Sequence, residues 1–131
     1  EIRKYAEDNG FSVNLHITGW VDNPMSYVEL FDVACLLSRW EGFGLALPEY
    51  MMAGKLIVAS RVDAIPNIIR DGENGLLVEV DDDTGASNAV LRIYQEDGLK
   101  DRLVTQGFED VHNRFNARRV SEEHGKLFER L

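Results

Sequence analysis

The chain has 131 residues, of which 44% are hydrophobic, and a formal net charge of -9 at pH 7. This size and composition fit a single globular domain over residues 1–131 and leave little room for a second. The acidic balance argues against broad electrostatic attraction to nucleic acid or anionic lipid. Placed cations such as Arg39, Lys55 or Arg61 could still hold a small anion locally.

The N-terminal part of the chain predicts a helix, a strand and a second helix. The first residues read as the last turns of a helix that stops at Gly10. Because the chain begins without an initiator methionine, we expect the natural protein to extend upstream. Residues 13–18 alternate apolar and polar side chains, which predicts a strand with unequal faces. Pro24 then marks the start of the next helix.

Residues 33–37 form a continuous apolar run, which is typical of a strand covered on both faces. Cys35 within this run is the only cysteine of the chain, and we predict a buried, unreactive side chain. One cysteine without a Cys/His cluster argues against a disulfide framework and against structural zinc. No apolar stretch approaches the roughly 18 residues that a membrane-spanning helix needs.

The second half of the chain continues to alternate helices and strands. We predict helices over about residues 45–53 and 65–70, and strands over residues 56–60 and 76–80. From residue 83 only helical spacing remains; the acidic run at 81–83 should cap a helix, and Asn116 should cap the last one. The fold class should be α/β: a Rossmann-like open parallel sheet with flanking helices and extra helices at the C-terminus.

The loop after the strand at 33–37 carries the candidate site, because open parallel sheets bind ligands beyond the carboxyl ends of their strands. Gly42 and Gly44 permit close approach of backbone to ligand, and the next helix start favours a diphosphate. Glu41 in the loop and Glu49 in the helix could border one pocket and accept hydrogen bonds from sugar hydroxyls. From the residues alone, a tight crossover also accounts for the glycines, and both acids could be solvated surface charges.

Residues 41–60 read EGFGLALPEYMMAGKLIVAS. This string resembles the Glu-x7-Glu region of the family 4 (group 1) retaining glycosyltransferases, where Glu-Gly-Phe-Gly-Leu is followed by three variable positions and Glu-Ala-Met-Ala. Residues 16–21 look like the family's apolar strand that ends in glycine. Residues 65–78 are similar to its Pro-Glu-Ile-Ile-x-Asp-Gly-x-Asn-Gly-Leu-Leu-Val segment. The resemblance extends over about half of the chain, with the segments in the right order.

The resemblance implies the C-terminal half of a GT-B fold, in which two Rossmann-like domains face each other and the C-terminal one holds a nucleotide sugar. Glu49 would bind the ribose hydroxyls. Glu41 would be the catalytic residue, orienting the donor sugar or stabilising positive charge at its anomeric carbon. Backbone contacts to the sugar and diphosphate would come from Gly42, Phe43, Gly44 and Leu45.

The same resemblance implies transfer without a metal ion or other cofactor. The partners would be a nucleoside diphosphate sugar and an acceptor glycan or lipid-linked sugar, with no nucleic acid. The acceptor domain and the family's Arg/Lys pair for the diphosphate would lie upstream of Glu1, so this piece alone should be inactive. We expect a cytoplasmic location, with any contact to the inner face of a membrane made through the missing parts.

The chain departs from the family pattern after the strand at 56–60. The family often has Gly-Gly-x-Pro-Glu where this chain has Asp-Ala-Ile-Pro-Asn at residues 63–67. A receiver-like signalling domain is disfavoured, since it needs acidic residues at early strand ends. A sugar-nucleotide epimerase, or a non-catalytic GT-B homologue that binds a nucleotide sugar, stays open as an alternative function.

Overall fold

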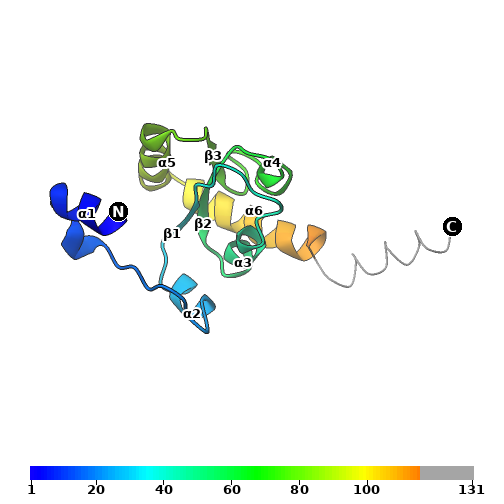
Figure 1. Ribbon diagram of the computed structural model, residues 1–131. Helices are drawn as coiled ribbons and strands as arrows, with labels where there is room; N and C mark the ends of the chain where they lie inside the picture. Colours follow the sequence, from blue (N-terminus) through cyan, green and yellow to red (C-terminus); the bar gives the residue numbers. More distant parts are fainter. Residues whose placement is uncertain (116–131) are drawn as a thin grey trace.

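The computed structural model describes residues 1–115, so the predicted final helix and its cap Asn116 lie outside the described residues. Figure 1 shows the elements, which in chain order are α1 (Ile2–Asp8), the 3-10 helix η1 (Ser12–Asn14), α2 (Met25–Val28), β1 (Val33–Leu36), α3 (Ala46–Met52), β2 (Leu56–Ser60), α4 (Ile65–Ile68), β3 (Leu76–Val78), α5 (Asp83–Gln95) and α6 (Leu99–Arg114). Within residues 1–115, no helix is both long and apolar enough to cross a membrane.

The three strands form one parallel sheet in the order β1-β2-β3. Val33 of β1 pairs with Leu56 of β2, and Val58 of β2 pairs with Leu76 of β3. Parallel neighbours need a crossover between them, and α3 and α4 lie in the two connections. The predicted α/β class with a parallel sheet and flanking helices is therefore confirmed.

The two faces of β2 support two hydrophobic cores. All five residues of β2 are buried, because this strand has a neighbour on each side. Ile57 and Ala59 pack with side chains of α3 and α4, whereas Leu56 and Val58 pack with side chains of α5. This division follows from the two-residue side-chain period of a strand.

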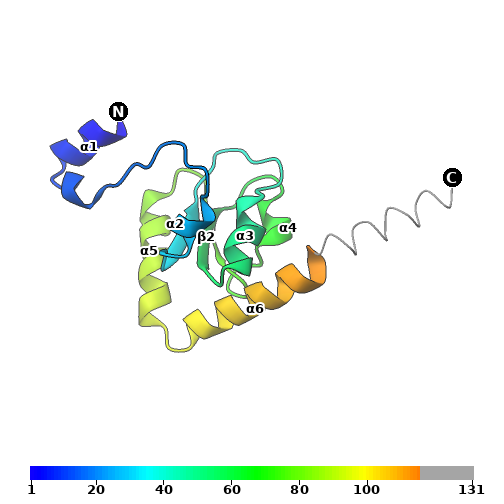
Figure 2. The ribbon, with the colours of Figure 1, turned by 90° about the horizontal axis from the view of Figure 1, so that it is seen from below.

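Helix α6 belongs to both cores. Leu99 and Leu103 in its first half pack with α5 and β3, whereas Val111 near its end packs with α3 and α4. Figure 2 shows α6 crossing the molecule from the end of α5 past α3 and α4. The two hydrophobic cores are therefore linked by a single continuous helix.

A buried polar contact fixes α6 to the turn before β3. Asn74 Nδ2 donates hydrogen bonds to Asp110 Oδ2 at 2.6 Å and to the Ile68 carbonyl at 3.1 Å. Asn74 Oδ1 accepts the N–H of Arg70 at 2.7 Å. The Arg70 guanidinium lies 3.0 Å from Asp110 Oδ2 and balances the charge of this carboxylate, which is only 5% exposed. Each polar group of this buried cluster is thus paired.

Helix boundaries follow the predicted signals closely. Gly10 after α1 has a φ of +76°, a conformation that glycine adopts freely. Asp82 is the N-cap of α5, and its Oδ1 accepts the N–H of Gly85 at 2.8 Å, so the interpretation of the acidic run as a cap is confirmed. Helix α4 and strand β3 each end two residues before their predicted bounds.

Residues 13–18 do not form the predicted strand. Residues 12–14 form η1, and residues 15–19 continue as irregular chain. A strand needs a neighbour for its backbone hydrogen bonds, and no strand of residues 1–115 pairs with this segment. Figures 1 and 2 show α1 and η1 apart from the sheet. The alternating pattern was therefore insufficient to predict pairing.

The prediction that residues 33–37 are covered on both faces is wrong. Strand β1 is an edge strand, and although Ala34 is buried, Cys35 is exposed. Nearby protein atoms still shield the thiol in part, and this desolvation raises the pKa of Cys35. A raised pKa reduces the thiolate fraction, which agrees with the predicted lack of reactivity.

Replacement of Asn74 by alanine should lower the free energy of unfolding by about 2–4 kcal/mol, because it removes the acceptor of the Arg70 N–H and a buried hydrogen bond to each of Asp110 and the Ile68 carbonyl. Urea denaturation measures this change. The control Asn88→Ala removes an exposed asparagine from α5 and should change the free energy by less than about 0.5 kcal/mol. Equal effects of the two substitutions would contradict this role of Asn74.

Candidate functional site

The candidate site lies where β1 and β2 end. Carboxyl ends of parallel neighbours lie at the same edge of a sheet, so the loop after Leu36 adjoins the loop after Ser60. The first loop, residues 37–45, carries most of the predicted site residues and is called the glycine loop below. The second loop carries Asp63.

A hydrogen bond joins the two loops. The backbone N–H of Glu41 donates to Asp63 Oδ2 at 2.9 Å, across 22 positions of the chain. Within the glycine loop, Ser38 Oγ donates to Glu41 Oε2 at 3.5 Å, which is a long contact. Glu41 is half-buried. Its backbone N–H bonds to Asp63, and its carboxylate faces the Ser38 hydroxyl.

The two glycines of this loop have different surroundings. Gly44 is buried with a φ of +75°, and a Cβ there would lie 3.3 Å from Leu47 Cδ1 and 3.4 Å from Glu41 Cγ. Gly42 is exposed, and no heavy atom lies within 4 Å of its Cβ position. Gly44 is thus required by the local fold, whereas Gly42 leaves open space beside the backbone.

The side chains of Phe43 and Leu45 lie in different environments. The Phe43 ring meets the Phe115 ring edge to face, with centroids 6.0 Å apart. This contact ties the glycine loop to the end of α6. Leu45 immediately precedes α3 and is 73% exposed. Their backbone groups are the part of these residues that the sequence analysis assigns to ligand binding.

Glu49 lies in the first turn of α3 and is exposed. A carboxylate in this position is favoured by the helix dipole. Burial, and after it the nearby charge of Glu49, raises the pKa of the Tyr50 phenol. In the described part of the chain no ion pair involves Glu41 or Glu49, so both carboxylates keep their capacity to accept hydrogen bonds.

Arg39 and Arg61 lie at the edge of the sheet that carries the site, but each already faces carboxylates. Arg39 Nε lies 2.8 Å from Asp81 Oδ1, and this hydrogen bond raises the pKa of Arg39. Arg61 lies 3.1 Å from Asp71 Oδ2 and 3.2 Å from Glu79 Oε1. A phosphate at this edge would compete with these carboxylates for the two guanidinium groups.

Lys55 does not belong to this edge. It directly precedes β2 and so lies at the amino end of the sheet, opposite the glycine loop. Its Nζ donates to the Glu29 carbonyl at 2.8 Å. Lys55 therefore lies apart from the glycine loop, and its capacity to hold a small anion stays a prediction.

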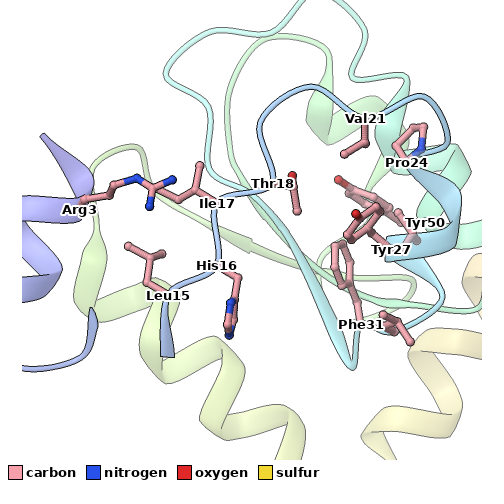
Figure 3. Close-up of a pocket in the computed structure, with 12 residues that line it drawn as sticks. Arg3, Leu15, His16, Ile17, Thr18, Val21, Pro24, Tyr27, Phe31 and Tyr50 are labelled. Atoms are coloured by element: carbon pink, nitrogen blue, oxygen red, sulfur yellow. The ribbon is translucent and has the colours of Figure 1, made fainter. Parts of the chain in front are cut away.

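Two cavities of the described residues are lined by side chains other than those of the predicted site. A small one of about 70 Å³ lies at the strand ends and includes Leu37, Ser60 and Val78 in its lining. A larger one of about 900 Å³ lies between the irregular segment 15–18 and α2, with Tyr50 of α3 in its lining. Figure 3 shows the side chains around this larger cavity. None of the predicted site residues lines either cavity.

The chemistry available at the glycine loop is hydrogen bonding and charge stabilisation. Exposed backbone at Gly42 can face an anionic or hydroxylated ligand, and the carboxylates of Glu41 and Glu49 can accept hydrogen bonds from hydroxyl groups. Within residues 1–115, no group of three or more His, Cys, Asp or Glu side chains is placed to hold a metal ion.

The part that Asp63 plays at this site was not predicted from the sequence. Residues 63–67 stood out only as a departure from a glycine-containing pattern. Asp63 takes a φ of +45°, which glycine adopts freely and which aspartate tolerates better than most residues. The sequence did contain a signal for this contact. Position 63 carries an aspartate, which can accept a backbone N–H, where the family 4 glycosyltransferase pattern often has glycine.

Comparison with known proteins identifies the family. The family described as "Glycosyl transferases group 1" matches residues 1–96. The phosphatidyl-myo-inositol mannosyltransferase of Mycolicibacterium smegmatis is 35% identical over 132 residues, which span 98% of this chain and 33% of that protein. The chain therefore belongs to the group 1 glycosyltransferases. It spans about a third of the length of the curated relatives it matches.

Solved structures agree with this assignment. Sucrose-phosphate synthase from Thermosynechococcus elongatus has a TM-score of 0.88 at 26% identity, and the match covers 98% of this chain and 33% of that chain. Anabaena HepE in complex with UDP has a TM-score of 0.93 at 16% identity, covering 99% and 36%, which is a likeness of fold. The predicted GT-B type of α/β fold is confirmed.

The two loop glycines should respond differently to alanine. Gly44→Ala should lower the free energy of unfolding by about 1–2 kcal/mol, because an L-residue is strained at positive φ and the added Cβ meets Leu47. Gly42→Ala should change this free energy by less than about 0.5 kcal/mol, because its Cβ enters open space. Thermal or urea denaturation of both variants checks the contrast, and a destabilised Gly42→Ala would contradict the assignment of open space.

Proposed function

We propose that the intact protein is a retaining glycosyltransferase and that this chain binds its donor, a nucleoside diphosphate sugar. The observation that carries this proposal is a pair of carboxylates outside any ion pair of the described residues: Glu41 within the anchored glycine loop and Glu49 in the helix that follows it. Membership in the group 1 family supports sugar transfer. The UDP complex of the HepE neighbour supports a nucleotide as the ligand at this fold.

Glu49 is proposed to bind the ribose of the donor. Vicinal hydroxyls donate two hydrogen bonds, and a carboxylate has two oxygens that accept them. Glu49 is exposed in the first turn of α3, so a ligand can reach it without displacing packed side chains.

The backbone of the glycine loop is proposed to contact the donor sugar and its diphosphate. The residues assigned to this role are Gly42, Phe43, Gly44 and Leu45. Open space beside Gly42 supports a close approach there. Gly44 contributes by setting the turn, since its positive φ directs the chain into α3.

Glu41 is proposed to be the catalytic residue. Departure of the nucleotide leaves positive charge at the anomeric carbon, and a fixed carboxylate nearby stabilises that charge more in the transition state than in the ground state. We expect this to occur without a metal ion or other cofactor. The diphosphate charge then has to be balanced by cations of the intact protein and by backbone N–H groups.

The acceptor is proposed to be a glycan or a lipid-linked sugar, and the setting polysaccharide or glycolipid synthesis in the cytoplasm. The relative from Mycolicibacterium smegmatis is named for mannosyl transfer to phosphatidyl-myo-inositol, which supports an acceptor of this class. Contact with the inner face of a membrane would be made by residues outside this chain.

Glu49→Ala should weaken binding of the donor nucleotide by about 1–3 kcal/mol, because the ribose hydroxyls lose their acceptor. Calorimetry on the protein at its natural length, with UDP, GDP and ADP as probes, measures this. Glu109→Ala on the exposed face of α6 is the control and should leave the affinity unchanged. Equal affinities of wild type and Glu49→Ala would remove Glu49 from the site.

Glu41→Gln should lower the rate of sugar transfer about 100-fold or more, with nucleotide affinity changed less than about threefold, because the charge matters mainly in the transition state. Release of nucleoside diphosphate from the donor measures the rate, and Glu109→Gln is the control. Product analysis separates transfer from epimerisation, since an epimerase converts the donor sugar without passing it to an acceptor. An unaffected rate would reject Glu41 as the catalytic residue.

A further inference from the structure

Asp63 contacts the backbone of the residue to which we assign catalysis. Its Oδ2 accepts the Glu41 N–H at 2.9 Å, so one carboxylate links the loop after β2 to the loop after β1. The side chain of Asp63 is exposed, and within residues 1–115 no ion pair engages it. The hydrogen bond from the Glu41 N–H is therefore the polar contact through which the Asp63 carboxylate holds the two loops together.

The backbone at position 63 is costly for an aspartate. A φ of +45° lies in the left-handed region, where an L-residue loses about 1–2 kcal/mol and glycine loses nothing. Since glycine would relieve this strain, the backbone conformation does not explain an aspartate here. The side chain does, because it supplies the acceptor for Glu41.

Glu41 is fixed by contacts on three of its parts. Its N–H is held by Asp63, its Oε2 is approached by Ser38 Oγ at 3.5 Å, and its Cγ lies close to Gly44. The bond to Asp63 is the shorter of the two hydrogen bonds and the one that comes from another loop. Loss of this hydrogen bond would release the backbone of Glu41, the residue to which we assign catalysis.

We infer that Asp63 is a positioning residue, which holds Glu41 and the glycine loop in the geometry for sugar transfer. This inference rests on the proposed function. Asp63 does not contact the reacting atoms itself. A displacement of a reacting group by as little as 1 Å can cost a large factor in rate, so a single loop anchor of this kind has a measurable effect on turnover.

Two substitutions separate the hydrogen bond from the backbone conformation. Asp63→Gly removes the acceptor and relieves the strained φ, whereas Asp63→Asn keeps a side-chain oxygen and tolerates the left-handed conformation. In the protein at its natural length, Asp63→Gly should lower kcat about 10- to 100-fold. Its melting temperature should stay within about 3 °C of wild type, because relief of strain offsets the lost bond. Asp63→Asn should restore kcat to within about threefold.

Asp81→Gly provides a matched control. Asp81 is also an exposed aspartate at positive φ, +61°, near the same edge, but its carboxylate pairs with Arg39 and not with Glu41. This variant should keep the wild-type kcat. The probes are UDP-glucose, UDP-N-acetylglucosamine and GDP-mannose, and the measured reaction is release of nucleoside diphosphate from whichever probe wild type consumes fastest.

The outcomes separate this inference from the proposed function. If wild type neither binds nor consumes any probe, the proposed function fails before the variants are compared. If wild type is active and Asp63→Gly matches its kcat, positioning by Asp63 is overturned. It is also overturned if Asp63→Asn is as slow as Asp63→Gly, or if the loss in Asp63→Gly comes with a clearly lower melting temperature.

Discussion

The buried amide of Asn74 is the interaction on which the rest of the structure depends. Through Asp110 it fastens α6 to the turn that leads into β3, and through residues 68 and 70 it closes the end of α4. Helix α6 in turn completes both cores and brings Phe115 to Phe43. The buried side chain of Asn74 thus helps to position α6, and Phe115 at the end of α6 contacts Phe43 of the glycine loop.

The candidate site is built from loops, yet backbone bonds and packing restrict it. Parallel pairing of β1 and β2 brings their carboxyl ends together, and the side chain of Asp63 then joins the two loops at Glu41. Gly44 turns the chain into α3 at a positive φ, in a place where an added Cβ would crowd Leu47 and Glu41. The carboxylates of Glu41 and Glu49 take part in no ion pair of the described residues, so both can accept hydrogen bonds from a ligand.

The sequence predicted the fold class and most elements because strand and helix periods are local and the turn residues mark their ends. It placed β2 correctly and identified the acidic run at residues 81–83 as a helix cap, which Asp82 provides. It failed at residues 13–18 and at Cys35, because pairing and burial depend on which elements lie alongside, and an apolar pattern does not specify a neighbour. The surroundings of Lys55 and the part played by Asp63 depend on contacts between distant positions, which no local pattern contains.

The anchor of the glycine loop has a consequence for how this site can evolve. Because the bond to Asp63 uses the main-chain N–H of position 41, it does not depend on the side chain carried there. Every residue except proline supplies that donor. The reactive group can therefore be exchanged while the scaffold that presents it persists, so selection can alter chemistry and architecture independently.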